Sequence, residues 1–250
     1  MLVCDNLSVN FGDKEILKNV SFSLKKSQNL LILGENGAGK STLAKALCSL
    51  TPSSSISLFE RELSYIPPKE RAALINYVPP KLESYDEDIT LMEYLQMGYF
   101  SRKKKFEPTL PIETEAALGL LCGFGLEDLA HKRLQTLSSG EKQTAMILQA
   151  AIQNSAITIF DEPIANIDAA RTQTLFSLLS GNDVFLQKIV ITHDLHFAFS
   201  LGFDVLFLKG GRREFFGSCE EFFDESEIKR RFGKSVQKCE LGVVTNYAKL

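Results

Sequence analysis

Hydrophobic positions along the chain follow two different periods, and their alternation predicts a fold of mixed strands and helices. Continuous apolar runs at Leu30–Leu33 and Ala156–Phe160 are typical of strands buried on both faces of a parallel sheet. In Ser41–Leu50 the apolar residues recur every three or four positions, which indicates a helix. The same patterns predict two more strands and another helix, over 188–191, 205–208 and 169–179. The expected fold class is α/β, with a mostly parallel sheet and flanking helices.

Extended segments also flank this core near the amino terminus. Two strand-like stretches, Leu2–Val9 and Ile16–Leu24, surround a turn at Gly12-Asp13 and predict antiparallel strands. A short helical segment from residue 69 leads into a further predicted strand, Leu74–Val78. Pro79-Pro80 should end that strand, because proline removes a donor from the ladder.

The middle of the chain, from 81 to 137, has mainly helical patterns, clearest at Ile89–Met97 and Ile112–Cys122. We expect this stretch to form a helical subdomain inserted in one domain that spans 1–250. A longer helix should follow, from about Glu141 to Gln153.

The end of the chain carries acidic and then basic residues over Cys219–Phe232, which predicts a pair of helices. We therefore expect a helical tail over 215–250.

Composition narrows the possible partners. The net charge of −3 argues against a nucleic-acid binder, which needs clustered Lys and Arg. The five cysteines are scattered without metal-ligand or disulfide spacing, which indicates a reducing compartment. The amino-terminal residues lack the pattern of a signal peptide, and no apolar run approaches the ~18 residues that a membrane-spanning helix needs. We expect no membrane span in this chain, although it can dock on a protein that has one.

A glycine-rich loop follows the first buried run. Gly34-Glu-Asn-Gly-Ala-Gly39-Lys40-Ser41 matches the phosphate-binding pattern G-x-x-x-x-G-K-[ST] between a predicted strand and a predicted helix. Glycines allow positive φ, so that backbone N–H groups and the helix N-terminus can face a triphosphate. Lys40 should reach the β- and γ-phosphates, and the Ser41 hydroxyl should ligate Mg²⁺. The candidate ATP-binding residues are Gly34, Asn36, Gly37, Ala38, Gly39, Lys40, Ser41 and Thr42.

Two acids, Asp161 and Glu162, end the second buried run. Ligands bind at the carboxyl ends of strands in open α/β sheets. Asp161 would hold Mg²⁺ through water, and Glu162 would polarise the attacking water. Acids after a strand are also common helix N-caps, so the phosphate loop is what favours the catalytic interpretation.

Four further features occur in order around these motifs. Phe11-Gly12 precedes the phosphate loop, and Leu137-Ser138-Ser139-Gly140-Glu141 precedes the acid pair. Ala165-Asn166-Ile167-Asp168 follows the acids, and His193 follows the next strand. With this set the chain resembles the ATP-binding cassette (ABC) ATPases over essentially its whole length. The resemblance implies a P-loop NTPase core that binds ATP and Mg²⁺.

The resemblance also implies roles for individual residues. Phe11 would stack on adenine, and His193 would contact the γ-phosphate as a second catalytic residue beside Glu162. A histidine satisfied at a strand end is the alternative for His193. Ser138, Ser139 and Gly140 would close on the ATP of a second copy, and Asp168 would lie in the loop that crosses that interface.

Two motifs depart from the family's usual pattern. The family usually has glutamine where this chain has Pro80, whose side chain offers no polar atom. Water could take that place, Lys81 could change the chemistry of the loop, or hydrolysis could be slow. The ABC signature reads Ser-Ser-Gly-Glu here, where Ser-Gly-Gly-Gln is commoner, and we expect Ser139 to be tolerated because the backbone N–H groups remain.

The stretch 89–100 and the tail around Phe232-Gly233 look like the ATPase subunits of bacterial importers for iron chelates, haem and vitamin B12. This resemblance implies two copies in a head-to-tail ATP sandwich, membrane-spanning permease subunits, and indirectly a substrate-binding protein. It places the chain at the cytoplasmic face of the inner membrane, with no nucleic-acid partner.

The helical stretch 81–137 would offer a groove to a short helix of the permease. Tyr94, Met97, Tyr99 and Phe100 could line this groove or belong to the core. The basic run Arg102–Lys105 fits a solvated loop, or less readily a surface that faces anionic lipid headgroups.

Two other functions stay open on the sequence. One is a soluble cassette that serves in cluster assembly or regulation, with cytosolic partners. The other, suggested by Pro80, is a nucleotide-binding regulatory subunit that hydrolyses little ATP.

Overall fold

The elements of the chain fall into two units in a computed structural model, which describes residues 1–51, 55–82, 88–104, 107–165, 167–181, 183–233, 236–239 and 242–245. The first unit is Met1–Ile66 with Ile189–Leu250, and the second is Pro67–Lys188. The second unit is therefore wider than the insertion expected over 81–137, because two strands fold with its helices.

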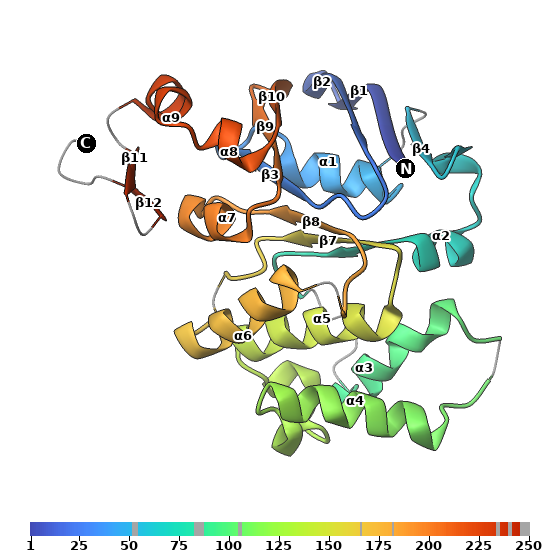
Figure 1. The fold of residues 1–250 in the computed structure, drawn as a ribbon. Coiled ribbons are helices and arrows are strands. Elements are labelled where there is room, and N and C mark those ends of the chain that lie inside the picture. Colours follow the sequence, from blue (N-terminus) through green and yellow to red (C-terminus); the bar gives the residue numbers. More distant parts are fainter. Residues whose placement is uncertain are drawn as a thin grey trace. The chain divides into compact units, whose positions relative to one another are not determined.

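An antiparallel sheet in the order β2-β1-β4-β5 forms one part of the first unit (Figure 1). Its strands are β1 (Leu2–Phe11), β2 (Lys14–Leu24), β4 (Ile56–Leu58) and β5 (Arg61–Glu62). β1 and β2 form the expected hairpin, with Phe11 opposite Lys14 at its tip. Alternate side chains of both strands, such as Leu7 and Val20, are buried, which gives the sheet one apolar face. A short 3-10 helix, η1 (Leu63–Tyr65), follows β5.

The strand before the phosphate loop, β3 (Leu30–Gly34), lies between two parallel strands of the same unit. Its neighbours are β8 (Lys188–Ile191) and β9 (Asp204–Lys209), and β10 (Arg212–Gly217) pairs antiparallel with β9. All four apolar residues of β3 are buried, which confirms a strand covered on both faces.

Helix α1 (Lys40–Leu47) follows the phosphate loop and ends three residues before the position expected from the hydrophobic pattern. Cys48 is its C-cap, and Ser49 has a φ of 57°. A non-glycine residue in this left-handed region cannot continue a right-handed helix, so the helix stops there.

The carboxyl-terminal elements of the first unit are α7 (Leu195–Leu201), α8 (Cys219–Phe222), α9 (Glu225–Phe232), β11 (Val236–Cys239) and β12 (Gly242–Thr245). The expected helix pair is present as α8 and α9. The expectation of a wholly helical tail over 215–250 is wrong, because β11 and β12 form an antiparallel hairpin. The hairpin carries β-branched residues such as Val236 and Val244, which favour strands.

Arg231 fixes α9 to the rest of the first unit. Its guanidinium lies 5.0–5.4 Å from the ring centroids of Phe207, Phe215 and Phe222. It also pairs with Glu227 at 2.7 Å and Glu214 at 3.5 Å, and its side chain is only 1% exposed. A buried arginine over aromatic faces, with carboxylate partners, is a stable arrangement for holding a terminal helix.

The second unit joins a pair of parallel strands to a group of helices. The strands are β6 (Ile75–Val78) and β7 (Ile157–Asp161), and α2 (Pro68–Leu74) precedes β6. The other helices are α3 (Leu91–Gln96), η2 (Met97–Ser101), α4 (Pro111–Gly123), η3 (Glu127–Leu129), η4 (Leu134–Thr136), α5 (Ser139–Gln153) and α6 (Ala169–Ser180). Among them α3, α4 and α5 pack against one another (Figure 1).

A single apolar cluster holds α3, α4 and α5 together. Leu91 and Leu95 of α3, Leu121 of α4 and Leu148 of α5 are all fully buried in it. Tyr94 and Tyr99 pack against this cluster, and the Tyr99 hydroxyl donates to the Glu113 carbonyl oxygen at 3.0 Å. These two tyrosines thus support the core of the helical group.

The basic run after η2 is solvated only in part, since Arg102 and Lys104 are exposed but Lys103 is buried. Lys103 is 7% exposed; its ammonium pairs with Glu113 and donates to the Pro108 carbonyl oxygen at 2.7 Å. Arg102 donates to the Ile152 carbonyl oxygen, while Lys104 is exposed and Lys105 lies outside the described residues. The expectation of a uniformly solvated run is wrong at Lys103, because a buried acceptor set holds its charge.

None of the helices in the described ranges is long and apolar enough to span a bilayer.

Candidate functional site

The phosphate loop has the backbone shape that its glycines allow. Gly34, Gly37 and Gly39 have φ values of 151°, 80° and 96°, a region that side chains disfavour. A Cβ at Gly34 would lie 2.3 Å from the Leu208 carbonyl oxygen of β9, so this position admits no side chain. The loop therefore forms a backbone cradle in which successive amide groups can turn toward an anion.

Lys40 lies at the base of this cradle. Its ammonium donates to the carbonyl oxygens of Gly34 at 2.8 Å and Glu35 at 3.0 Å, and its side chain is 8% exposed. A cation held by the loop's own backbone, beside a glycine cradle, suits a polyphosphate. The donor set of this loop therefore fits ATP.

The helix that follows begins without a side-chain cap. The N-cap of α1 is Gly39, which has no side chain and so makes no side-chain cap bond. The helix N-terminus is thus a partial positive charge next to the cradle. Ser41, in this first turn, is exposed, and Thr42 is half-buried.

Phe11 lies at the tip of the β1–β2 hairpin and is 57% exposed. The same hairpin contacts the phosphate loop, because a Cβ at Gly39 would lie 2.7 Å from Cδ2 of Leu17. An exposed ring on an element that touches the loop is suited to stack on a base.

His193 comes directly after the strand beside β3. Ile191 of β8 lies opposite Ile32 of β3 in a parallel register, so His193 comes level with Gly34 two residues further on. Thr192 Oγ1 accepts a hydrogen bond from the Asp194 N–H at 3.1 Å, which shapes the turn around His193. The register thus brings this exposed histidine to the edge of the sheet where the phosphate loop begins.

The acid pair ends β7 in the second unit. Asp161 is 1% exposed, and its Oδ2 accepts a hydrogen bond from the Tyr77 hydroxyl at 2.9 Å. The sequence did not indicate Tyr77, because the contact depends on the register of two strands that lie far apart along the chain. Mg²⁺ prefers oxygen ligands, so the Asp161 carboxylate is suited to hold this ion.

Glu162 has an unusual backbone. Its φ is 50°, and its carbonyl oxygen accepts from the Ala165 N–H at 3.1 Å in the turn that follows β7. Glutamate in the left-handed region is strained, and such strain concentrates at functional sites. No feature of the sequence predicts this conformation.

The signature residues begin α5. Ser138 is the N-cap, with Glu141 as the reciprocal partner of a capping box. Ser138 and Ser139 are exposed, and Gly140 is buried. The predicted helix N-terminus at this motif is therefore present.

Asp168 is the N-cap of α6 and accepts from the Arg171 N–H at 2.9 Å. Asn166, two residues earlier, lies outside the described residues. Asp168 is exposed, and its second carboxylate oxygen, Oδ2, lies 3.5 Å from Nη1 of Arg171.

The predicted site residues therefore form two groups. Phe11, the phosphate loop and His193 belong to the first unit, and the acids, the signature and Asp168 belong to the second.

Comparison with known proteins identifies the family. Residues 17–165 match the sequence model of the family described as ABC transporter. The chain belongs to the ABC transporter family. Like other ABC ATPases it binds ATP with Mg²⁺ and hydrolyses it.

Two relatives of this ABC protein match along nearly the whole chain. The manganese transport system ATP-binding protein MntB of Bacillus subtilis (strain 168) is 30% identical over 92% of this chain and 91% of its own length. The phosphonates import ATP-binding protein PhnC of Fusobacterium nucleatum is also 30% identical, over 92% of this chain and 97% of its own length.

A solved structure supports the fold of the ABC protein. An ATP-binding subunit of an ABC transporter superposes with a TM-score of 0.77 at 26% identity, over 93% of both chains. The expected P-loop NTPase fold of an ABC ATPase is thus confirmed.

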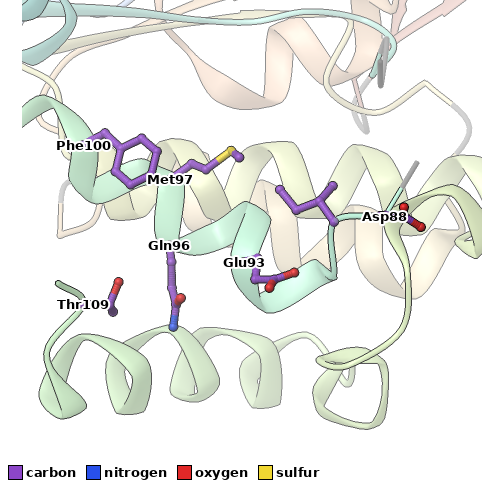
Figure 2. Close-up of a pocket in the computed structure, with 7 residues that line it drawn as sticks. Asp88, Glu93, Gln96, Met97, Phe100 and Thr109 are labelled. Carbon is purple, nitrogen blue, oxygen red and sulfur yellow. The ribbon is translucent and has the colours of Figure 1, made fainter. Parts of the chain in front are cut away.

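A groove on the second unit of the ABC protein runs along α3 and η2 (Figure 2). Its volume is about 420 Å³, and it is lined by Asp88, Ile89, Glu93, Gln96, Met97, Phe100 and Thr109. Of the four residues that could line such a groove or belong to the core, Met97 and Phe100 line it, whereas Tyr94 and Tyr99 pack against the core. Gln96 bridges to α4, donating to Thr114 Oγ1 at 3.1 Å.

Proposed function

We propose that this ABC protein is the ATP-hydrolysing subunit of an importer, working as a head-to-tail dimer on membrane-spanning permease subunits. The observation that carries the proposal is the glycine cradle with Lys40 at its base, in a family of ATP-hydrolysing transport proteins. The chain would act peripherally at the cytoplasmic face of the membrane, and a substrate-binding protein would deliver the cargo.

The residues divide the chemistry among them. Phe11 stacks on adenine, and Gly34, Asn36, Gly37, Ala38, Gly39, Lys40, Ser41 and Thr42 surround the phosphates. The Ser41 hydroxyl would ligate Mg²⁺ and Asp161 would hold the ion through water, and the ion would neutralise phosphate charge. Glu162 holds the attacking water and takes its proton, and His193 donates to the γ-phosphate.

Mg²⁺ needs few protein ligands in such a site. Among the described residues, no three His, Cys, Asp or Glu side chains gather where they could hold a metal alone. Phosphate oxygens and water would supply most of the ligands of Mg²⁺, so the Ser41 hydroxyl and the Asp161 carboxylate would suffice from the protein.

The second copy completes the site. Ser138, Ser139 and Gly140 start α5, whose N-terminal end carries partial positive charge toward the γ-phosphate of the partner's ATP. Asp168 lies in the loop between the two copies. Closure of the dimer therefore depends on bound ATP and is coupled to hydrolysis.

Purified protein and two pairs of matched variants test the enzyme assignment. Lys40→Ala should abolish ATP binding, while Lys45→Ala, on the exposed side of the same helix, should bind normally. Glu162→Gln should bind ATP but lose turnover by ~10²-fold or more, while Glu115→Gln on α4 should keep it. Turnover at the parent rate in Glu162→Gln would remove Glu162 from the mechanism. Binding without turnover in the parent would favour a regulatory subunit, which Pro80 suggests.

The groove along α3 and η2 is the proposed contact with the permease. Its lining is apolar at Ile89 and Met97 and carries two carboxylates, those of Glu93 and of Asp88, which also pairs with Arg133 at 3.0 Å. These features fit a short helix with an apolar face and a basic residue. Met97 and Phe100 are 38% and 63% exposed, as expected for anchors of a partner.

Co-purification from detergent-solubilised membranes tests this contact. The parent should bring down a multi-span membrane protein, and Met97→Glu should lose it. Leu118→Glu, on exposed α4 outside the groove, is the control and should retain it. A cytosolic partner, or none, would support a soluble cassette in cluster assembly or regulation instead.

We propose a metal ion or a metal chelate as the cargo, with an iron chelate, haem or a cobalamin-type molecule as the specific candidates. The relative named for manganese transport supports a metal, and the relative named for phosphonate import provides the competing class. Uptake of labelled manganese, iron and cobalamin by cells carrying parent or Glu162→Gln protein distinguishes them. Loss of growth on phosphonate with unchanged metal uptake would exclude the metal proposal.

A further inference from the structure

Tyr77 and Asp161 meet because of the register between two parallel strands. In the β6–β7 pair, Tyr77 lies opposite Ile159. Side chains alternate along a strand, so Asp161 projects from the same face as Ile159, one step toward the carboxyl end. The long tyrosine side chain covers this step, and its hydroxyl donates to Asp161 Oδ2 at 2.9 Å.

The carboxylate of Asp161 needs such a partner. Its residue is 1% exposed, and a buried carboxylate without hydrogen bonds carries a large desolvation cost. The terminal torsion of aspartate is broad, so a carboxylate without a partner can rotate. A hydrogen bond on Oδ2 restricts this rotation and directs Oδ1 to a fixed place.

The same strand lacks the polar group that the family usually offers at its end. Pro80 follows Tyr77 by three residues, and its side chain has no donor or acceptor. β6 pairs with β7 through its backbone, and the hydroxyl of Tyr77 adds a side-chain hydrogen bond to Asp161 of that strand.

We propose that Tyr77 is a positioning residue for ATP hydrolysis, which holds Asp161 so that its other oxygen faces the Mg²⁺ of MgATP. The inference rests on the proposed role of Asp161 on the metal side of the nucleotide. Tyr77 touches neither nucleotide nor metal and acts through Asp161 alone. Mutation of a group that orients a metal-holding side chain typically lowers metal affinity by about 10–100-fold.

The test measures how much Mg²⁺ strengthens ADP binding. Calorimetric titration gives the ADP dissociation constant in EDTA and in saturating Mg²⁺, and the ratio of the two is the magnesium gain. Tyr77→Phe keeps the ring and removes the hydroxyl; its magnesium gain should fall about tenfold, while ADP affinity in EDTA stays at the parent value. Tyr77→Met repeats the test without the ring, in case packing in Tyr77→Phe affects folding.

Tyr99→Phe is the matched control, because it removes another tyrosine hydroxyl bond of the same unit, to a neutral carbonyl at 3.0 Å. It should keep the parent magnesium gain. Melting temperatures of the nucleotide-free variants separate a structural effect, since a purely structural role of Tyr77 lowers its melting temperature and leaves the magnesium gain unchanged. That result would overturn the inference.

Asp161→Asn separates this inference from the function on which it rests. If Asp161→Asn loses the magnesium gain while Tyr77→Phe keeps it, Asp161 retains its role and Tyr77 has none. If Asp161→Asn keeps the parent gain, the assignment of Asp161 itself is wrong.

Discussion

The Ser138 hydroxyl and the Glu141 carboxylate each bond to the other's residue at the start of α5. The Glu141 N–H donates to Ser138 Oγ at 3.3 Å, and Glu141 Oε2 accepts from the Ser138 N–H at 2.7 Å and from its hydroxyl at 2.8 Å. These bonds to the ionised form lower the pKa of Glu141, the bond from the Ser138 N–H contributing most. The glutamate that departs from the usual signature thus closes a capping box.

The capping box should make stability depend on pH through Glu141. Because its pKa is lower in the folded chain than in the unfolded chain, Glu141 contributes stability above about pH 4.5. That contribution is lost as pH falls through the folded pKa. Glu141→Gln should lower the melting temperature at pH 7, and the difference from the parent should disappear in acid. Melting curves across this pH range, with Glu115→Gln as control, measure it; a constant difference would contradict the expectation.

The backbone conformation of Glu162 should lower the stability of the protein. A glycine relieves the strain of its φ of 50°, whereas an alanine removes the carboxylate and keeps the strain. Glu162→Gly should therefore be more stable than Glu162→Ala by about 1 kcal/mol, and both should lose turnover. Urea unfolding of the two variants provides the comparison. Equal midpoints would mean that the backbone at this position is not strained in solution.

Two glycines of the helical group should respond oppositely to alanine. A Cβ at Gly98 would lie 2.7 Å from the Gln149 carbonyl oxygen and 2.8 Å from Cγ2 of Ile152, so η2 would have to move away from α5. Gly98→Ala should reduce the free energy of unfolding by about 1–3 kcal/mol.

Gly119 is the matched control, because nothing lies within 4 Å of a Cβ there and the residue is within α4. Gly119→Ala should increase stability by about 0.5–1 kcal/mol, since alanine favours helix. Chemical denaturation measures both. A Gly98→Ala protein as stable as Gly119→Ala would show that the η2–α5 contact can adapt without cost.

Lys103 and Lys104 should differ although they are neighbours in the basic run. Lys103→Met leaves the Glu113 carboxylate without its ammonium and should lower the melting temperature, whereas the exposed Lys104→Met should not. The hydrogen bond from Lys103 is the main cause of a lowered pKa at Glu113, so the gap between the two variants should narrow in acid. Scanning calorimetry at pH 7 and pH 4 checks both the order and its pH dependence.

Much of the core could be predicted from the sequence because burial on both faces leaves continuous apolar runs. The strand before the phosphate loop and the strand before the acids are of this kind, and each lies where it was expected. The helix α7 and the strand β10 were not predicted. α7 (Leu195–Leu201) is short and apolar without a clear period, and β10 (Arg212–Gly217) has no fully buried residue and begins with charged residues.

The site shows a similar division between local and long-range information. The glycine pattern around Lys40 specifies a cradle by itself, since the bonds from its ammonium reach only five and six residues back. The bond from Tyr77 joins residues 84 positions apart and depends on strand register, which no local pattern contains. The burial of Lys103 likewise depends on its ion pair with Glu113, which lies ten residues further along the chain. The run of basic residues alone predicts side chains exposed to solvent.

The two kinds of ion pair on α9 imply different responses to ionic strength. Salt screens exposed pairs such as Lys229–Glu225, whose side chains are 66% and 71% exposed, but it screens buried pairs far less. The attachment of Arg231 to the phenylalanine cluster should therefore persist in concentrated salt. Counter-ions would screen the exposed charges of α9 and leave the helix in place, so the attachment of α9 should not depend on salt concentration.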